Sequence, residues 1–166
     1  IGSVCDIACD YCFYLEKREL YPRGQSFKMP DEVLAKYIEQ YVAAQPTSVV
    51  EFVWHGGEPT LLGVDFFRRV VELQKPYREK KEIRNALQTN AMGLDDEWCA
   101  FFKANDFFIG VSLDGPQAIH DRYRKDRKGL GTFERVMSGV RLLQKHGVEF
   151  NALACVGRET AQHPLE

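Results

Sequence analysis

Residues 5–12 read CDIACDYC, so Cys5, Cys9 and Cys12 lie close together with the spacing C-x3-C-x2-C. Thiolates are soft ligands that suit iron–sulfur clusters. A loop this short can wrap one cubic cluster and supply a thiolate to three of its four irons. The fourth iron would then have no protein ligand from this loop and would be open to a small molecule. The pattern therefore predicts a [4Fe–4S] cluster with one reactive iron.

Zinc and free thiols are the alternatives that these cysteines leave open. A zinc knuckle usually pairs two ligand groups that close a tetrahedron, and here only His55 suits the role of a distant fourth ligand. A disulfide is disfavoured, because three cysteines leave one unpaired and nothing else indicates a secreted scaffold. Cys99 lies in an apolar run and Cys155 in a strand-like run. Both are expected to pack as small hydrophobes.

The composition is that of a globular protein of about one domain. The 166 residues are 45% hydrophobic and 28% charged, and the formal net charge is -2. That charge gives no electrostatic case for a nucleic acid or an anionic membrane surface. No apolar run approaches the roughly 18 to 20 residues of a membrane span, and no signal-peptide pattern is present. We expect a reducing, cytoplasmic setting, with no nucleic-acid partner and no membrane association.

Strand-like and helical patterns alternate along the chain. Residues 49–54, VVEFVW, are β-branched and aromatic and predict a buried strand. Apolar residues at helical spacing follow an acidic turn at Asp31. Alternation of this kind predicts parallel βαβ units with right-handed crossovers, whose carboxyl ends form the catalytic face. The expected strands are 1–4, 49–54, 83–89, 107–113 and 148–156; the expected helices are 31–44, 65–75, one opened by Asp95 and one capped by Thr132.

Gly56-Gly57-Glu58-Pro59 directly follows the strand expected at 49–54. Glycine has no side chain to obstruct a ligand, so backbone can approach it closely. Exposed carbonyls and the Glu58 carboxylate could accept hydrogen bonds from an ammonium group. The alternative is a tight turn that simply requires glycine. The motif falls at the predicted catalytic face in either case.

Three stretches together carry a resemblance to a known family. They are residues 1–17, residues 54–61 (WHGGEPTL) and residues 112–116 (SLDGP). The chain resembles the radical S-adenosylmethionine (SAM) superfamily and, within it, the anaerobic sulfatase-maturating enzymes. The resemblance implies an α/β fold, a partial (β/α)6 TIM-like barrel that stops before its last strand. Residues 1–166 would be the core domain of a longer protein, without its C-terminal domain of auxiliary clusters.

The resemblance also implies roles for particular residues. Cys5, Cys9 and Cys12 would bind the cluster. A basic run at residues 120–128 is expected to be mostly solvated surface, but one arginine near the site would suit bidentate capture of the SAM carboxylate. Arg124 is indicated for that role, with Arg135 as the competitor. The other residues implied to bind SAM are Tyr11, Gly56, Gly57, Glu58, Pro59 and Ser112; those expected to face substrate are Tyr14, His55 and Asn90.

The implied reaction is reductive cleavage of SAM to a 5′-deoxyadenosyl radical, which then oxidises a sulfatase cysteine or serine to Cα-formylglycine. The partners would be an unfolded sulfatase or another peptide, and an electron donor such as ferredoxin or flavodoxin. The general base is expected outside these residues. Two alternatives remain: another radical SAM peptide maturase that forms thioethers or crosslinks, and a non-catalytic metal-binding or iron–sulfur module.

Overall fold

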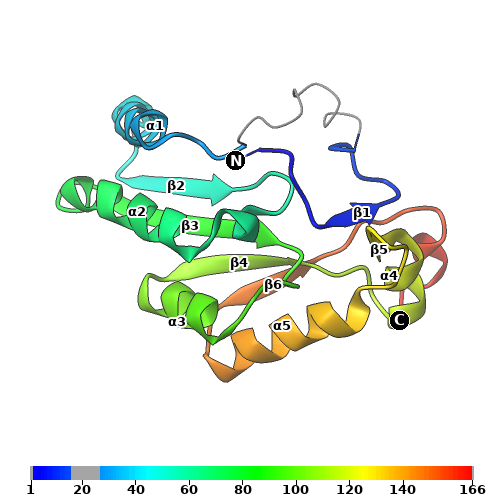
Figure 1. Ribbon diagram of the computed structural model, residues 1–166. Helices are drawn as coiled ribbons and strands as arrows, with labels where there is room; N and C mark the ends of the chain where they lie inside the picture. Colours follow the sequence, from blue (N-terminus) through cyan, green and yellow to red (C-terminus); the bar gives the residue numbers. More distant parts are fainter. Residues whose placement is uncertain (1, 16–26, 166) are drawn as a thin grey trace.

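The computed structural model describes residues 2–15 and 27–165, and its centre is a four-stranded parallel sheet (Figure 1). The strands are β2 (Val49–Trp54), β3 (Glu82–Thr89), β4 (Phe107–Ser112) and β6 (Phe150–Leu153), paired in the order β2-β3-β4-β6. Trp54 pairs with Leu87, Leu87 with Ile109, and Ile109 with Phe150. The carboxyl ends of the strands therefore meet at one edge.

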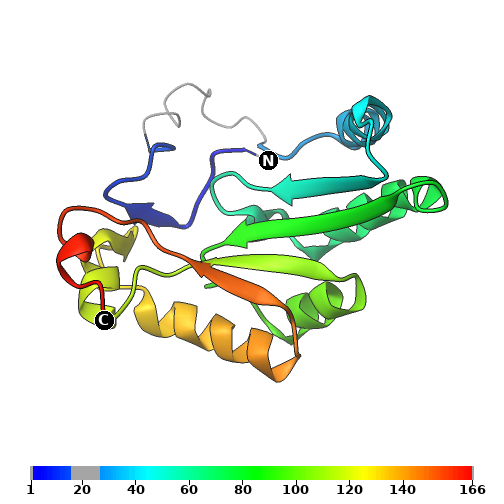
Figure 2. The same cartoon turned by 180° about the vertical axis from the view of Figure 1, so that it is seen from behind.

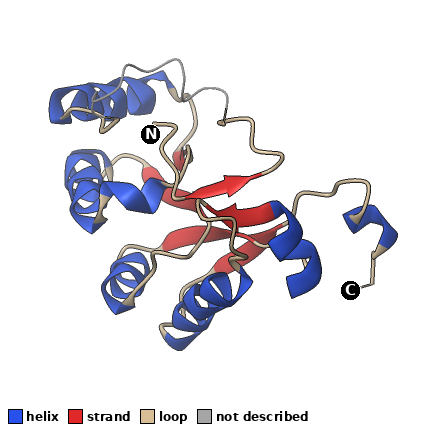
Figure 3. Ribbon diagram, turned by 45° about the vertical axis from the view of Figure 1, so that its right-hand side comes forward, coloured by secondary structure: helices blue, strands red, loops and turns tan. Residues whose placement is uncertain are grey.

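Helices that precede or connect these strands cover one face of the sheet (Figures 1 and 3). They are α1 (Asp31–Ala44), α2 (Val64–Gln74), α3 (Asp96–Ala104) and α5 (Phe133–Lys145), with short 3-10 turns η2 (Pro59–Leu62), η3 (Lys75–Tyr77) and η4 (Thr160–Gln162). The opposite face, seen from behind in Figure 2, carries no helix in the described part of the chain. Val53, Phe108 and Leu153 are exposed there.

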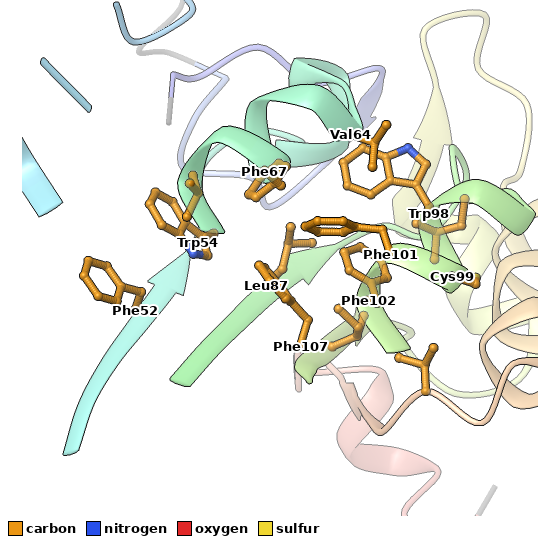
Figure 4. Packing of buried hydrophobic residues seen from close by; sticks show 14 of the residues in the cluster. Phe52, Trp54, Val64, Phe67, Leu87, Trp98, Cys99, Phe101, Phe102 and Phe107 are labelled. Carbon is orange, nitrogen blue, oxygen red and sulfur yellow. The ribbon is translucent and has the colours of Figure 1, made fainter. Parts of the chain in front are cut away.

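The core lies between the sheet and these helices and is rich in aromatic rings (Figure 4). Phe67 of α2 packs edge-on against Trp54, Trp98 and Phe107, which come from three different elements. Edge-to-face packing of this kind adds to the stabilisation from burial. The indole of Trp54 donates to Asn85 Oδ1 at 2.9 Å, so its polar group is also satisfied.

A second, two-stranded sheet lies beyond the carboxyl ends of the parallel strands (Figure 1). It pairs β1 (Ile7–Cys9) antiparallel with β5 (Arg124–Asp126), which follows the short helix α4 (Gln117–Tyr123). The pairing places the cysteine loop over the end of the parallel sheet.

Several sequence predictions are confirmed and some are wrong. The helix expected at 31–44 is α1, and the four later strands are present, although the last is shorter than 148–156. The strand expected at 1–4 is absent from the described residues 2–4, and Ile1 lies outside the described residues. Gly2 and Val4 instead accept hydrogen bonds from Gly57 and Glu58, which belong to a turn rather than a strand.

Residues 120–128 are less solvated than expected, because His120 is buried in addition to Arg124, the arginine that the resemblance indicates for the site. This run forms the end of α4 and all of β5, and it buries His120 and Arg124. Thr132 does precede α5, but its hydroxyl donates to the carbonyl of Arg124 instead of capping the helix. Asp121 accepts the hydrogen bond from the first helical amide, that of Phe133.

Among the described residues, no helix has the length and apolarity that crossing a membrane requires.

Candidate SAM and cluster site

Cys5, Cys9 and Cys12 line one cavity of about 190 Å³ at the carboxyl ends of the parallel strands. The same cavity is lined by Gly56, Gly57 and Glu58 of the turn after β2, and by Ser112 at the end of β4. Three stretches that are far apart in sequence therefore meet at one place. The remaining lining residues are Ile7, Tyr11, Phe13, Tyr14, His55, Gln88, Thr89, Asn90, Arg124 and Cys155.

Backbone hydrogen bonds attach the cysteine loop to the turn after β2. The amide of Gly57 donates to the Gly2 carbonyl at 3.0 Å, and the amide of Glu58 donates to the Val4 carbonyl at 2.8 Å. A Cβ on Gly57 would overlap the Val4 carbonyl, so this close approach requires glycine. The glycine of the motif thus has a local structural reason in addition to any role in binding.

Side chains hold the loop from the other directions. Arg127 donates to the Cys5 carbonyl, and the side-chain amide of Asn90 donates to Asp6 Oδ1 at 2.7 Å. The Asn90 nitrogen also lies 4.0 Å from Cys5 Sγ. Asn90, which the resemblance implies to face substrate, lines the cavity, and its buried side chain also secures the loop.

Burial favours the protonated form of two of these thiols, those of Cys5 and Cys9. Burial raises the pKa of Cys5 to about 12 and that of Cys9 to about 11, although the Arg124 guanidinium opposes the effect at Cys9. Since metals bind thiolates, loading of this site must release protons.

The three cysteines are spread along the cavity rather than gathered around one point. In residues 2–15 and 27–165, no three His, Cys, Asp or Glu side chains are arranged to hold one metal ion. A [4Fe–4S] cluster distributes its thiolates over different iron atoms, so cysteines that share a cavity without meeting at one point suit it. His55 also lines the cavity, but the zinc alternative would need its ring and the thiols to converge.

Glu58 is buried and already has several hydrogen-bond partners. Its Oε1 accepts hydrogen bonds from the backbone amide and the hydroxyl of Thr60 and from the Thr89 hydroxyl. Its Oε2 accepts one from the backbone amide of Asn90. Burial raises the pKa of this carboxyl, and these four donors oppose the rise. Glu58 therefore joins the ends of β2 and β3, and three of these four hydrogen bonds go to Oε1 and one to Oε2.

Asp114 and Arg124 form a buried ion pair at the other side of the cavity. Arg124 Nε and Nη2 donate to the two Asp114 oxygens at 2.9 and 3.0 Å. Asp114 also accepts bonds from the Tyr11 hydroxyl and from the Cys155 amide. Arg124 Nη1 lies 3.9 Å from Cys9 Sγ. Asp114 thus occupies the Nε and Nη2 side of the guanidinium, and Nη1 lies towards Cys9.

The structure separates the two candidate arginines. Arg124 lines the cavity, whereas Arg135 lies outside it and donates to Asp126 at 2.8 Å on the surface. Pro59 is buried as the first residue of η2 and does not line the cavity either. Tyr11 and Ser112 do line it, and Ser112 accepts a hydrogen bond from Gln88 at 2.9 Å.

Tyr14 and His55 lie next to each other at the cavity, with ring centroids 6.1 Å apart. Cys99 is fully buried in the core, as predicted. Cys155 is not packed as a strand residue, since β6 ends at Leu153 and the exposed Cys155 lines the cavity.

Sequence reasoning did not single out Asp114, although this residue lies within the SLDGP stretch at residues 112–116. The available signal was a charged residue directly after a buried strand. A buried carboxylate needs partners, but those partners come from residues 11, 124 and 155, and nothing in the sequence pattern brings them together.

Comparison with known proteins agrees with this geometry. The family model described as Radical SAM superfamily matches residues 1–166. A serine-type anaerobic sulfatase-maturating enzyme of Bacteroides thetaiotaomicron is 47% identical over 166 residues, which are 100% of this chain and 40% of that enzyme. A cysteine-type anaerobic sulfatase-maturating enzyme of Clostridium perfringens is 40% identical over a match that spans 98% of this chain and 44% of that enzyme.

A solved structure described as native anSMEcpe with bound AdoMet and Cp18Cys peptide superposes with a TM-score of 0.86 at 38% identity. The match covers 98% of this chain and 43% of that one. The chain thus spans about 40% of the length of the curated relatives that it matches.

Proposed function

The chain belongs to the radical SAM superfamily, and from that premise we propose that its full-length protein oxidises a cysteine or serine of a sulfatase to Cα-formylglycine. The observation that carries the proposal is the shared cavity, where three cysteines, the glycine turn and Ser112 meet. Similarity along the whole chain to serine-type and cysteine-type sulfatase-maturating enzymes supports the substrate class.

Cys5, Cys9 and Cys12 would hold a [4Fe–4S] cluster through their thiolates. When bound, the cluster would supply the electron that cleaves SAM and so yields the 5′-deoxyadenosyl radical. The backbone of Gly56 and Gly57 would accept the SAM ammonium group, with Glu58 Oε2 close by. Ser112 would contact the ribose or carboxylate region, where Arg124 supplies a positive charge.

Tyr14 and His55 would meet the substrate peptide, because both line the cavity and Phe13 beside them is 63% exposed. Asn90 would act indirectly, by fixing Asp6 in the cluster loop. The walls of the cavity would orient the target side chain and exclude water from the radical. An external reductant such as ferredoxin or flavodoxin would deliver the electron to the cluster.

The test uses the full-length protein, reconstituted with iron and sulfide without oxygen. It is incubated with SAM, a reductant and two matched sulfatase peptides that differ only in cysteine or serine at the target position. We expect 5′-deoxyadenosine together with the peptide mass change of aldehyde formation. Cys12→Ala should abolish both products, whereas Cys99→Ala, which removes a core thiol outside the cavity, should retain them.

Each other outcome has a definite meaning. Deoxyadenosine with both peptides unchanged would transfer the chemistry to another substrate, such as a peptide that receives a thioether or crosslink. A protein that holds its cluster but forms neither product would overturn the enzymatic proposal in favour of a non-catalytic iron–sulfur module.

A further inference from the structure

Asp114 is a fully buried carboxylate that four hydrogen bonds satisfy. Its side chain is 0% exposed, and that of its partner Arg124 is 9% exposed. The donors come from the cluster loop (Tyr11), from β5 (Arg124) and from the segment after β6 (Cys155). A charge in such a place is stabilised only if its partners are held in good geometry. Asp114 therefore joins three segments around the cavity.

The backbone of Arg124 is fixed independently of Asp114. Its carbonyl accepts a hydrogen bond from the Thr132 hydroxyl at 2.9 Å, and its Cα lies opposite that of Cys9 in the antiparallel β1–β5 pair. Directly opposed residues have neighbouring side chains on the same face. Arginine is long and flexible, however, so this register alone does not decide where its guanidinium lies.

The hydrogen bonds to Asp114 determine where the guanidinium lies. Asp114 occupies Nε and Nη2 of the guanidinium, and the remaining Nη1 lies 3.9 Å from Cys9 Sγ. Tyr11 reinforces the arrangement, because its ring centroid lies 5.5 Å from the Arg124 guanidinium carbon and its hydroxyl donates to Asp114. The planar fork of arginine suits this bidentate grip, which lysine could not reproduce.

We propose that Asp114 is a positioning residue that holds the Arg124 guanidinium against Cys9 Sγ, and that this contact raises the reduction potential of the bound cluster. The inference rests on the proposed function in one respect: the cysteines must bind a cluster. Reduction adds one electron, hence one negative charge, to the cluster. A positive N–H donor at a ligand sulfur stabilises the reduced form, because hydrogen bonds to sulfur and net charge set the potential.

The experiment is a double-mutant cycle with the potential as its readout. The full-length protein, without SAM or peptide, is titrated under anaerobic conditions and the reduced cluster is followed by its electron paramagnetic resonance signal. The signal that disappears in Cys12→Ala identifies this cluster among any others. The variants are Arg124→Gln, Asp114→Asn and the double variant, with Arg135→Gln as the matched control. Arg135 loses the same charge but contacts Asp126 outside the cavity.

We expect Arg124→Gln to lower the potential and Arg135→Gln to leave it within error of the wild type. In the Asp114→Asn background, the shift caused by Arg124→Gln should fall to less than half, because the guanidinium is no longer held at Cys9. Coupling between neighbouring groups appears as such non-additivity. Equal shifts in the two backgrounds, or no shift from Arg124→Gln, would overturn the inference.

A further variant keeps the test decisive if Asp114→Asn does not fold. Arg124→Lys preserves the charge but not the fork, so we expect the potential to fall here as well. A wild-type potential in Arg124→Lys would mean that charge alone matters, and positioning would be rejected. Iron content separates the two proposals. A wild-type protein without a cluster overturns the proposed function and this inference together. A loaded and active protein in which Asp114→Asn and Arg124→Gln show no coupling overturns only the inference.

Discussion

At the scale of single residues, His120 shows how a buried ring is fixed in one protonation state. Its Nδ1 accepts a hydrogen bond from the backbone amide of Asp114 at 3.3 Å, and its Nε2 lies 3.0 Å from the Thr132 hydroxyl. That hydroxyl donates its own proton to the Arg124 carbonyl, so Nε2 must be the donor. The bonds fit the neutral ring, whereas a proton on Nδ1 would face another N–H.

The pH dependence of stability should carry the signature of this ring. Burial, followed by the nearby Arg124 charge, lowers the pKa of His120 below its ordinary 6.5. Below that pH the unfolded chain binds a proton that the folded chain excludes, so the free energy of unfolding falls as the pH falls. One such group accounts for up to about 1.4 kcal/mol per pH unit.

Urea unfolding between pH 5 and 7, at intervals of about half a unit, measures the effect. The change of the unfolding free energy with pH is proportional to the difference in bound protons between the unfolded and folded chains. We expect His120→Gln to be less stable at pH 7 and to depend less on pH. Burial also lowers the pKa of His55, but that residue is present in both proteins and its contribution cancels. Parallel pH profiles for the two proteins would contradict the assignment.

Gly57 carries the second prediction at this scale. Since a Cβ there would overlap the Val4 carbonyl, Gly57→Ala should displace residues 2–4 and with them the cysteine loop. We expect a clear loss of bound iron after reconstitution while the circular dichroism spectrum stays close to that of the wild type. Gly93→Ala is the control, because its Cβ would meet only the Thr60 hydroxyl, at 3.4 Å. Equal iron content in the two variants would show that the close approach is dispensable.

At the scale of elements, α5 lies unusually close to the segment after β3. A Cβ on Gly139 would overlap the Ala91 carbonyl, so the helix approaches that segment through its glycine. Ala91 itself has a positive φ of 59°, which a residue with a side chain adopts at some cost. The contact fixes the loop that leads from Thr89 and Asn90, both of which line the cavity.

Gly139→Ala should therefore destabilise the protein, against the usual gain of about 1 kcal/mol for this change inside a helix. We expect a loss of about 1 to 3 kcal/mol in the free energy of unfolding, the usual range for forcing extra volume into packed sites. Ser138→Ala, on the exposed side of the same helix, should stay within about 0.5 kcal/mol. Urea midpoints compare the two, and a stabilised Gly139→Ala would refute the packing argument.

The same scale separates what the sequence could predict from what it could not. Helix α1 was predictable because an acidic first turn precedes apolar residues at helical spacing, among which Leu34 and Ile38 are buried in the structure. The pair α4 and β5 was not, because the charged run at 120–128 reads as surface. It is ordered by partners from other elements: Thr132 contacts His120, and β1 supplies the strand that pairs with Arg124.

The candidate site follows the same division. The spacing of the three cysteines and the glycine turn after β2 are local patterns, and their residues do share one cavity. The choice between Arg124 and Arg135 depends on where each guanidinium lies in space. Asp114 decides that for one and Asp126 for the other, and no spacing rule encodes either pairing.

At the scale of the whole molecule, the buried apolar residues in the described part of the chain form two unequal clusters. The larger one joins the parallel sheet to its helices. The smaller one consists of Cys5, Ile7 and Cys9, with Cys12 and Met92 against it. Local opening follows such differences in buried contact. The cysteine loop has little apolar support and is held mainly by hydrogen bonds, so we expect bound metal to add to its local order.

Removal of iron should therefore loosen the loop without unfolding the molecule. We expect amide hydrogen exchange to accelerate in residues 7–12 after anaerobic chelation, while β3 and β4 keep their protection, because their bonds lie in the larger cluster. Cys12→Ala, which should hold no intact cluster, is expected to exchange rapidly there before and after chelation. If protection falls together across the loop and the parallel sheet, the molecule is a single cooperative unit and the cluster supports all of it. If protection changes in neither, these cysteines do not bind the metal that orders the loop.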